Sequence, residues 1–196
     1  VSEGNFTASG QVIRWHVETS FQNGISTAFN KVTFSSAQPL GDLRFINYLD
    51  EDVQFPSEDL VYRVGTPGQP DFRLFTLDGV QRIGFSQGGI YAPGVDLVNA
   101  TYDGFAADSF ANLRTAITGT GTNYTVAGNI NLTNLPAITD PVLGPVNGPN
   151  DVTTAMAWTV DPNSITATIT TFLELVARDP ASKAGDWRSI NLEKYS

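Results

Sequence analysis

Residues 165–176 most constrain how this chain can fold, because apolar and hydroxyl side chains alternate along them. A period of two with many β-branched residues is typical of a strand that has one buried and one polar face. One parity is mainly apolar and the other mainly threonine (Ile165, Ala167, Ile169, Leu173 and Leu175 against Thr166, Thr168, Thr170 and Glu174), with Phe172 and Val176 as exceptions. The pattern predicts a long strand of a two-layer sandwich.

Shorter runs of the same kind predict further strands in most of the chain. They cover residues 29–34, 43–49, 60–64, 72–77, 81–85 and 155–160, and residues 161–164 have the composition of a type I turn. The first segment also alternates, but the adjacent Val12 and Ile13 break its phase, which suggests a bulge or two short strands. We therefore expect an all-β, two-layer antiparallel β-sandwich, jelly-roll-like, with one short helix and extended terminal arms.

The helix is predicted from apolar residues at helical spacing. They begin at Phe105 or Ala106 and continue through Phe110, Leu113 and Ile117. Asp103 is the expected N-cap and Gly119 the expected stop. Residues 118–149 then form a connector rich in Gly, Thr, Asn and Pro, with one candidate strand at 124–132.

Three units are expected along the chain. Residues 1–20 form an N-terminal arm and first strand, residues 21–177 the sandwich domain, and residues 178–196 a C-terminal arm. The last segment carries apolar side chains that a solvated tail does not need, namely Trp187, Ile190, Leu192 and Tyr195.

Composition narrows the classes of function. Charged residues make up only 16% of the 196 residues, and the formal net charge is −9. Nucleic acids and anionic membrane surfaces require basic patches, so neither is an expected partner, and no apolar window is long enough for a membrane span. Few Lys, many Thr and Asn, and no Cys are typical of exported bacterial or archaeal surface proteins. We expect a secreted protein, extracellular or at the cell surface.

Several segments between residues 29 and 176 together resemble a known kind of domain. They are Tyr48-Leu-Asp-Glu-Asp52, Leu74-Phe-Thr-Leu-Asp78, Ile83-Gly-Phe-Ser-Gln-Gly-Gly89, Asp103-Gly-Phe-Ala-Ala-Asp-Ser109 and Asp151-Val-Thr-Thr-Ala-Met-Ala-Trp-Thr-Val-Asp-Pro162. This pattern is similar to a secreted bacterial β-sandwich domain of exosortase-sorted (PEP-CTERM-type) surface proteins. The resemblance implies a β-sandwich at the cell surface and assigns no catalytic residues.

Two kinds of site can be proposed from residue type alone. Asp50, Asp52 and Asp59 offer carboxylate oxygens to Ca²⁺, although a solvated acidic loop explains them equally well; no other cofactor is expected. Four Asn-x-Thr sequons mark candidate glycosylation sites, which are Asn5, Asn99, Asn123 and Asn131.

No nucleophile–base pair is recognisable, and His16 is the only histidine, so we expect no enzyme. The first functional hypothesis is a structural subunit that forms a filament or surface layer by strand exchange between copies. Its expected interface residues are apolar and terminal: Phe6, Ala8, Val12, Trp187, Ile190, Leu192 and Tyr195. The alternative is a carbohydrate-binding module with Trp15, Tyr91, Tyr102 and Tyr124 as stacking rings.

Overall fold

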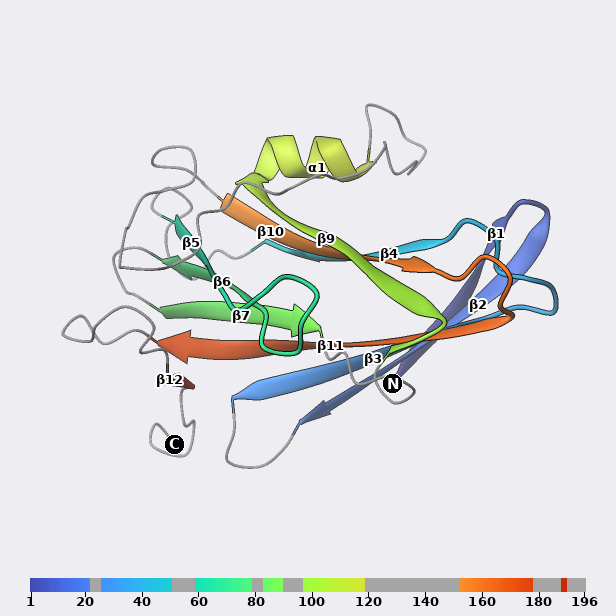
Figure 1. Ribbon diagram of the computed structural model, residues 1–196, viewed down its shortest axis with the longest axis horizontal. Coiled ribbons are helices and arrows are strands. Elements are labelled where there is room, and N and C mark those ends of the chain that lie inside the picture. The colour runs from blue at the N-terminus through green and yellow to red at the C-terminus, as the bar shows by residue number, and fades with distance from the viewer. Residues whose placement is uncertain are drawn as a thin grey trace.

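A computed structural model describes residues 1–21, 26–50, 59–78, 83–89, 97–118, 152–177 and 188–189. In this part of the chain the strands form two antiparallel sheets that pack face to face, and one helix covers the outer side of the smaller sheet (Figure 1). The all-β sandwich with one short helix is confirmed.

Among the described residues, nine strands form the larger sheet. Seven follow in the spatial order β1 (Ser2–Ala8), β2 (Gln11–Phe21), β3 (Thr27–Ser35), β11 (Thr166–Ala177), β7 (Ile83–Gly89), β6 (Arg73–Asp78) and β5 (Asp59–Val64). The short strands β8 (Leu97–Val98) and β12 (Arg188–Ser189) also pair with β11. The smaller sheet has the order β4 (Arg44–Leu49), β10 (Val152–Val160) and β9 (Ala100–Ser109), and the helix α1 spans Phe110–Thr118.

The predicted alternating strand is the centre of the larger sheet. β11 pairs with β3 on one side and with β7 on the other. Ala167 and Ile169 are fully buried against the smaller sheet, as the alternation predicts. The exception at Phe172 has a structural reason, because its ring packs beside Gly88 and under the Arg73 guanidinium, whose carbon lies 4.2 Å from the ring centroid. Both faces of β11 are therefore buried near its end.

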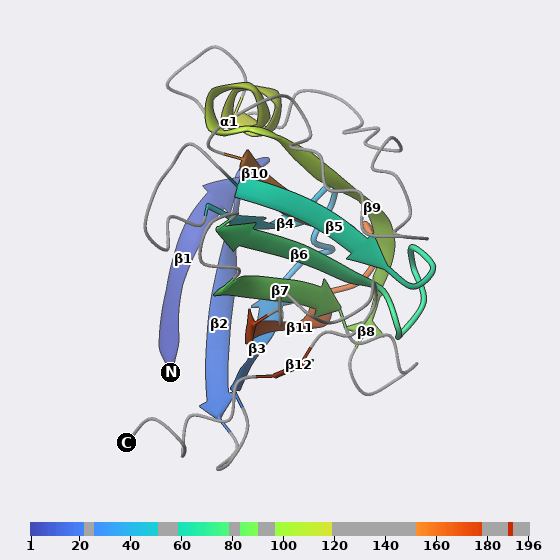
Figure 2. The ribbon, with the colours of Figure 1, turned by 90° about the vertical axis from the view of Figure 1, so that its left-hand side faces the viewer.

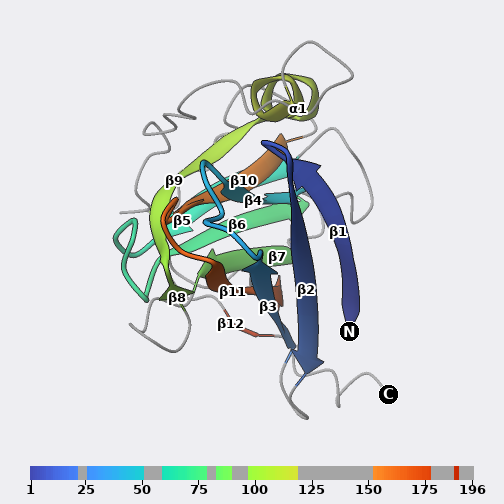
Figure 3. The ribbon, with the colours of Figure 1, turned by 90° about the vertical axis from the view of Figure 1, so that its right-hand side faces the viewer.

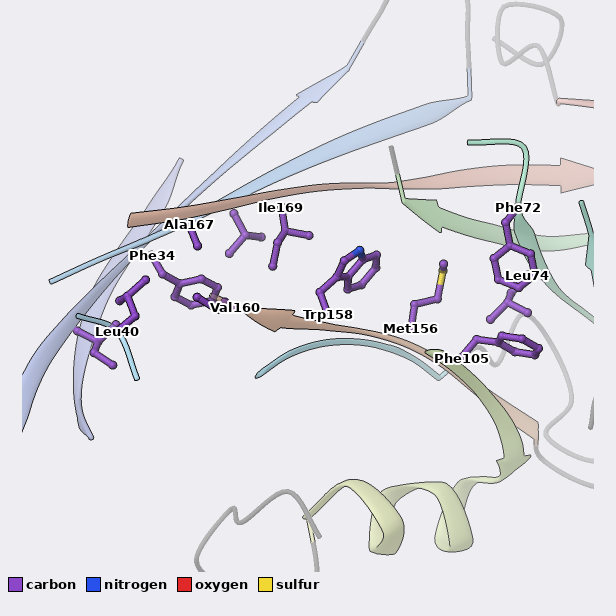
Figure 4. Close-up of a cluster of buried hydrophobic side chains, with 12 residues drawn as sticks. Phe34, Leu40, Phe72, Leu74, Phe105, Met156, Trp158, Val160, Ala167 and Ile169 are labelled. Atoms are coloured by element: carbon purple, nitrogen blue, oxygen red, sulfur yellow. The ribbon is translucent and has the colours of Figure 1, made fainter. Parts of the chain in front are cut away.

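The main core lies between β10 and the larger sheet. Figure 4 shows Met156, Trp158 and Val160 of β10 pointing towards the larger sheet, opposite Ala167 and Ile169 of β11. Trp158 has no exposed surface, and its ring centroid lies 5.7 Å from that of Phe45 and 6.1 Å from that of Tyr102. Burial of these aromatic and aliphatic groups is the main force that holds the two sheets together.

A buried polar cluster crosses the same interface. The Gln87 side-chain amide on β7 donates to the Thr154 hydroxyl on β10 at 2.6 Å and accepts from the Asn47 amide on β4 at 3.0 Å. The Thr154 hydroxyl also lies 3.3 Å from the hydroxyl of Thr76 on β6. Because buried polar groups are costly without partners, these contacts favour one relative register of the two sheets.

The predicted start of the helix is wrong. Phe105 and Ala106 belong to β9, where Phe105 faces the main core and Ala106 faces the helix. Pairing with β10 outweighs the helical spacing of these two residues, and α1 begins only at Phe110. Asp103 is no N-cap, since its carboxylate forms an ion pair with Arg44 at 2.9 Å. Leu113 and Ile117 do pack on the smaller sheet, as the spacing predicts.

The segment predicted as an N-terminal arm and first strand lies within the larger sheet, because β1 pairs with β2 of the same chain. Ser9 and Gly10 both have positive φ, 50° and 79°, and form the two-residue turn between β1 and β2. A hydrogen bond holds the turn to the rest of the domain, since the Gln11 side-chain amide donates to the Pro39 carbonyl at 2.7 Å. Figures 2 and 3 show β1 lying along β2 as the last strand of the sheet. Residues 1–20 are thus part of the sandwich.

Two residues of the predicted C-terminal arm are described, Arg188 and Ser189. Arg188 and Ser189 pair with Ala177 and Val176, so the chain returns to its own β11 there. The four predicted anchors, Trp187, Ile190, Leu192 and Tyr195, lie outside the described residues, as do the predicted helix stop Gly119 and the candidate strand 124–132.

Candidate functional site

The outer side of β1 is the first feature of a candidate site. β1 pairs with β2 through all seven of its residues, and in the described part of the chain no strand pairs with its other side. Natural edge strands are commonly protected by Lys, Pro or a bulge. The sequence of β1, Ser-Glu-Gly-Asn-Phe-Thr-Ala, has neither Lys nor Pro and a single charged residue, Glu3, and its register with β2 is unbroken. Such an edge can accept another strand.

Apolar side chains are exposed along this edge. Phe6 is 36% exposed although it lies opposite the fully buried Ile13, and Val12 on β2 is 54% exposed. The structure therefore leaves two of the predicted interface residues accessible. Ala8 is different, because it packs against the core cluster of its own chain.

The second feature is a groove on the face of β1, β2 and β3 that points away from the smaller sheet. On β2, Ile13 is buried in the core, so Arg14 and His16 project from the opposite face. The groove has a volume of about 500 Å³ and is lined by Glu3, Gly4, Asn5, Arg14, Trp15, His16, Thr33 and Ser35. A neighbouring hollow of about 400 Å³ shares Arg14 and Ser35 and adds Val12, Ser36 and Ala37. The combined surface offers many hydrogen-bond donors and acceptors.

His16 lies between two carboxylates in this groove. Its Nδ1 is 3.5 Å from a Glu3 oxygen on β1, and its Nε2 is 3.3 Å from a Glu18 oxygen on β2. The two carboxylates meet different ring nitrogens, and among the described residues no cluster of His, Asp and Glu could hold a metal ion. Hence His16 is a polar contact between the edge strand and its neighbour.

Sequence reasoning missed this groove as a unit. It considered His16 and Trp15 separately, considered Asn5 only as a glycosylation site, and passed over Glu3 and Arg14. A signal was present, because Ser9-Gly10 is a turn dipeptide of hairpin type. Once the turn is recognised, the register places Glu3 opposite His16 and Asn5 opposite Arg14.

The expected calcium site lies mostly outside the described residues and stays a prediction. Asp50 ends the segment that follows β4, Asp59 begins β5 but its side chain is not described, and Asp52 lies outside the described residues. Two of the four sequons can be placed: Asn5 is exposed on β1, and the Asn99 amide donates to the Thr166 carbonyl at 2.8 Å. Asn123 and Asn131 lie outside the described residues.

The expected stacking rings do not form a platform. The Trp15 ring is half-buried and covers Gly4, and Tyr102 packs in the core with its ring centroid 6.3 Å from that of Phe72. Tyr91 and Tyr124 are outside the described residues. A sugar bound in the groove would therefore depend on hydrogen bonds more than on stacking.

Comparison with known proteins identifies no relative: no protein-family model, curated protein or solved structure matches this chain. Within the described ranges, no helix has the length and apolar character that crossing a membrane requires.

Proposed function

We propose that this protein is an extracellular, non-enzymatic structural subunit that self-assembles into a filament or surface layer through strand edges of neighbouring copies. The observation that carries the proposal is the outer side of β1, which pairs with no strand of the described part of the chain and lies at the end of the larger sheet. Backbone groups of such an edge supply affinity for an added strand, and exposed apolar side chains beside it add burial. The low charge content and the absence of Cys support an extracellular location.

Edge addition fits the geometry of β1 better than exchange of β1 between copies. Exchange would separate the seven paired residues of β1 and β2 and would have to open a two-residue turn. Addition of a further strand breaks none of these contacts. The strand exchange expected for the C-terminal arm, residues 178–196, stays a prediction, since only Arg188 and Ser189 in that stretch are described.

The proposal predicts that the Asn5→Pro variant loses assembly. Proline removes one backbone donor from the free edge and is tolerated in edge strands whose N–H faces solvent. We expect the wild-type chain to form larger species with rising concentration and Asn5→Pro to stay monomeric, by light scattering after gel filtration and by negative-stain electron microscopy.

Asn5→Ala is the matched control, because it removes the same side chain and keeps the backbone N–H. It should assemble like the wild type, and circular dichroism should show that both variants are folded. A wild-type chain that remains monomeric at every concentration tested would refute the proposal, as would normal assembly of a folded Asn5→Pro variant.

A second candidate function, carbohydrate binding, is favoured by the groove around Arg14 and His16. Its amide, hydroxyl, guanidinium and carboxylate groups can donate to and accept from sugar hydroxyls. Glycan-array binding followed by calorimetry would test it: we expect Arg14→Ala to weaken binding about tenfold, since hydrogen bonds to charged groups contribute about 1.5–3 kcal/mol.

Arg114→Ala on helix α1 removes the same charge from another element and should leave glycan affinity unchanged. Absence of binding to any glycan by the wild-type chain, or equal losses for the two arginine variants, would exclude the groove as a sugar site.

A further inference from the structure

We infer that β1 pairs with β1 of a second copy, antiparallel, about a two-fold axis that passes through Asn5. This inference rests on the proposed self-assembly and deepens it by naming the partner strand and the register. Because a two-fold pairing closes as a dimer, growth into a filament or layer requires a further contact at another edge of the chain. In this register Asn5 of one copy lies opposite Asn5 of the other. The remaining residues pair symmetrically about this position: Gly4 with Phe6, Glu3 with Thr7, and Ser2 with Ala8. All seven residues of β1 are then paired on both sides.

The free backbone groups of β1 suit this register. Antiparallel ladders alternate hydrogen-bonded and non-hydrogen-bonded pairs, and a two-residue turn closes on a hydrogen-bonded pair, here Ala8 and Gln11. Counting from that pair, Glu3, Asn5 and Thr7 direct their N–H and C=O groups away from β2. The register matches these three residues only with one another. Every outward donor and acceptor of β1 thereby obtains a partner.

Side chains on the core side of the edge are self-complementary in the same register. Gly4 lies opposite Trp15, and a Cβ at Gly4 would come within 2.6 Å of the Trp15 ring. Phe6 lies on the same side of β1 and is 36% exposed. Pairing places Phe6 of the second copy opposite Gly4, which the Trp15 ring of the first copy covers. The exposed Phe6 would then contact Trp15 of the first copy.

Charges on the other face do not oppose the pairing. Glu3 is the only charged residue of β1, and the register places it opposite the neutral Thr7 rather than opposite the second Glu3. Its carboxylate keeps the contact with His16 on its own β2. Like charges directly opposite each other are destabilising in sheets, and this arrangement has none within the paired strands.

Site-specific cross-linking tests the register, since the natural chain has no Cys. Single Asn5→Cys and Thr7→Cys variants of the full chain would be oxidised under mild conditions and followed by non-reducing electrophoresis. In a dimer of one single-Cys variant, only Cys at position 5 lies directly opposite the same Cys of the second copy. The Cα atoms of these two residues are then within the separation that disulfides allow. We expect a covalent dimer of Asn5→Cys to form about tenfold faster than that of Thr7→Cys, because pairing raises the effective thiol concentration.

A mixture of Glu3→Cys and Thr7→Cys chains provides the positive counterpart, because the register pairs these two positions. It should yield mixed dimers faster than either variant alone. Equal rates for Asn5→Cys and Thr7→Cys overturn the two-fold register. If the wild type still assembles, as judged by light scattering, that result refutes the register and leaves the proposed function standing; a wild type that stays monomeric refutes both. A rapid Asn5→Cys dimer that never grows larger supports the register and refutes the filament or layer.

Discussion

Replacing Trp158 with Ala is expected to lower the free energy of unfolding by about 3–5 kcal/mol, the range for large aromatic side chains lost from a core. The ring is fully buried between the two sheets and contacts Phe45 and Tyr102. Its removal leaves a cavity at the centre of the interface, lined by groups from both sheets, that a β-sandwich can fill only in part. Urea denaturation followed by circular dichroism measures the difference.

Two control variants make the Trp158 prediction specific. Ile165→Ala removes an aliphatic side chain that is 54% exposed and should change the stability by less than about 0.5 kcal/mol. Trp158→Phe keeps an aromatic ring in place and removes an indole N–H that has no acceptor among the described residues. It should therefore cost clearly less than the change to Ala. A Trp158→Ala variant as stable as Ile165→Ala would contradict the core described above.

Replacing Gln87 with Leu is expected to lower the free energy of unfolding by about 2–3 kcal/mol, although Leu is the more hydrophobic residue. The substitution removes the donor to Thr154 and the acceptor for Asn47 and leaves both partners at the interface between the sheets. Losing one partner of a buried polar pair costs more than the net value of the hydrogen bond, because the other partner stays desolvated. Denaturation of the same kind measures this loss.

A double-mutant cycle separates the Gln87–Thr154 contact from effects of shape. Thr154→Val removes the hydroxyl that Gln87→Leu would leave without its amide donor. The loss of stability in the double variant should therefore be smaller than the sum of the two single losses by about 1 kcal/mol. Thr33→Val provides a hydroxyl control on the groove face, where Thr33 lies 3.3 Å from Thr168 and is only half-buried. It should cost less than Gln87→Leu. Additive losses at Gln87 and Thr154 would show that the contact carries no energy of its own.

The candidate edge shows how much of the site could be predicted from the amino-acid sequence. Phe6 and Val12 were predicted as interface residues, and the structure leaves both accessible. Their positions in the sheet were not predicted, because the phase break at Val12-Ile13 permits either a bulge or two short strands. The register of β1 with β2 decides between these, and with it which face Arg14 and His16 share.

By itself, the sequence determined the strands whose faces differ in polarity and the turn after β10, because a period of two and turn chemistry are local properties. β11 is the clearest case, with Ala167 and Ile169 buried as its alternation requires. Three features follow from no local pattern: Phe105 and Ala106 continue a strand, Phe172 is buried on the polar face, and β1 lies at an edge of the sheet. Each of these depends on pairing or packing with residues far away in the chain, and no local pattern records such partners.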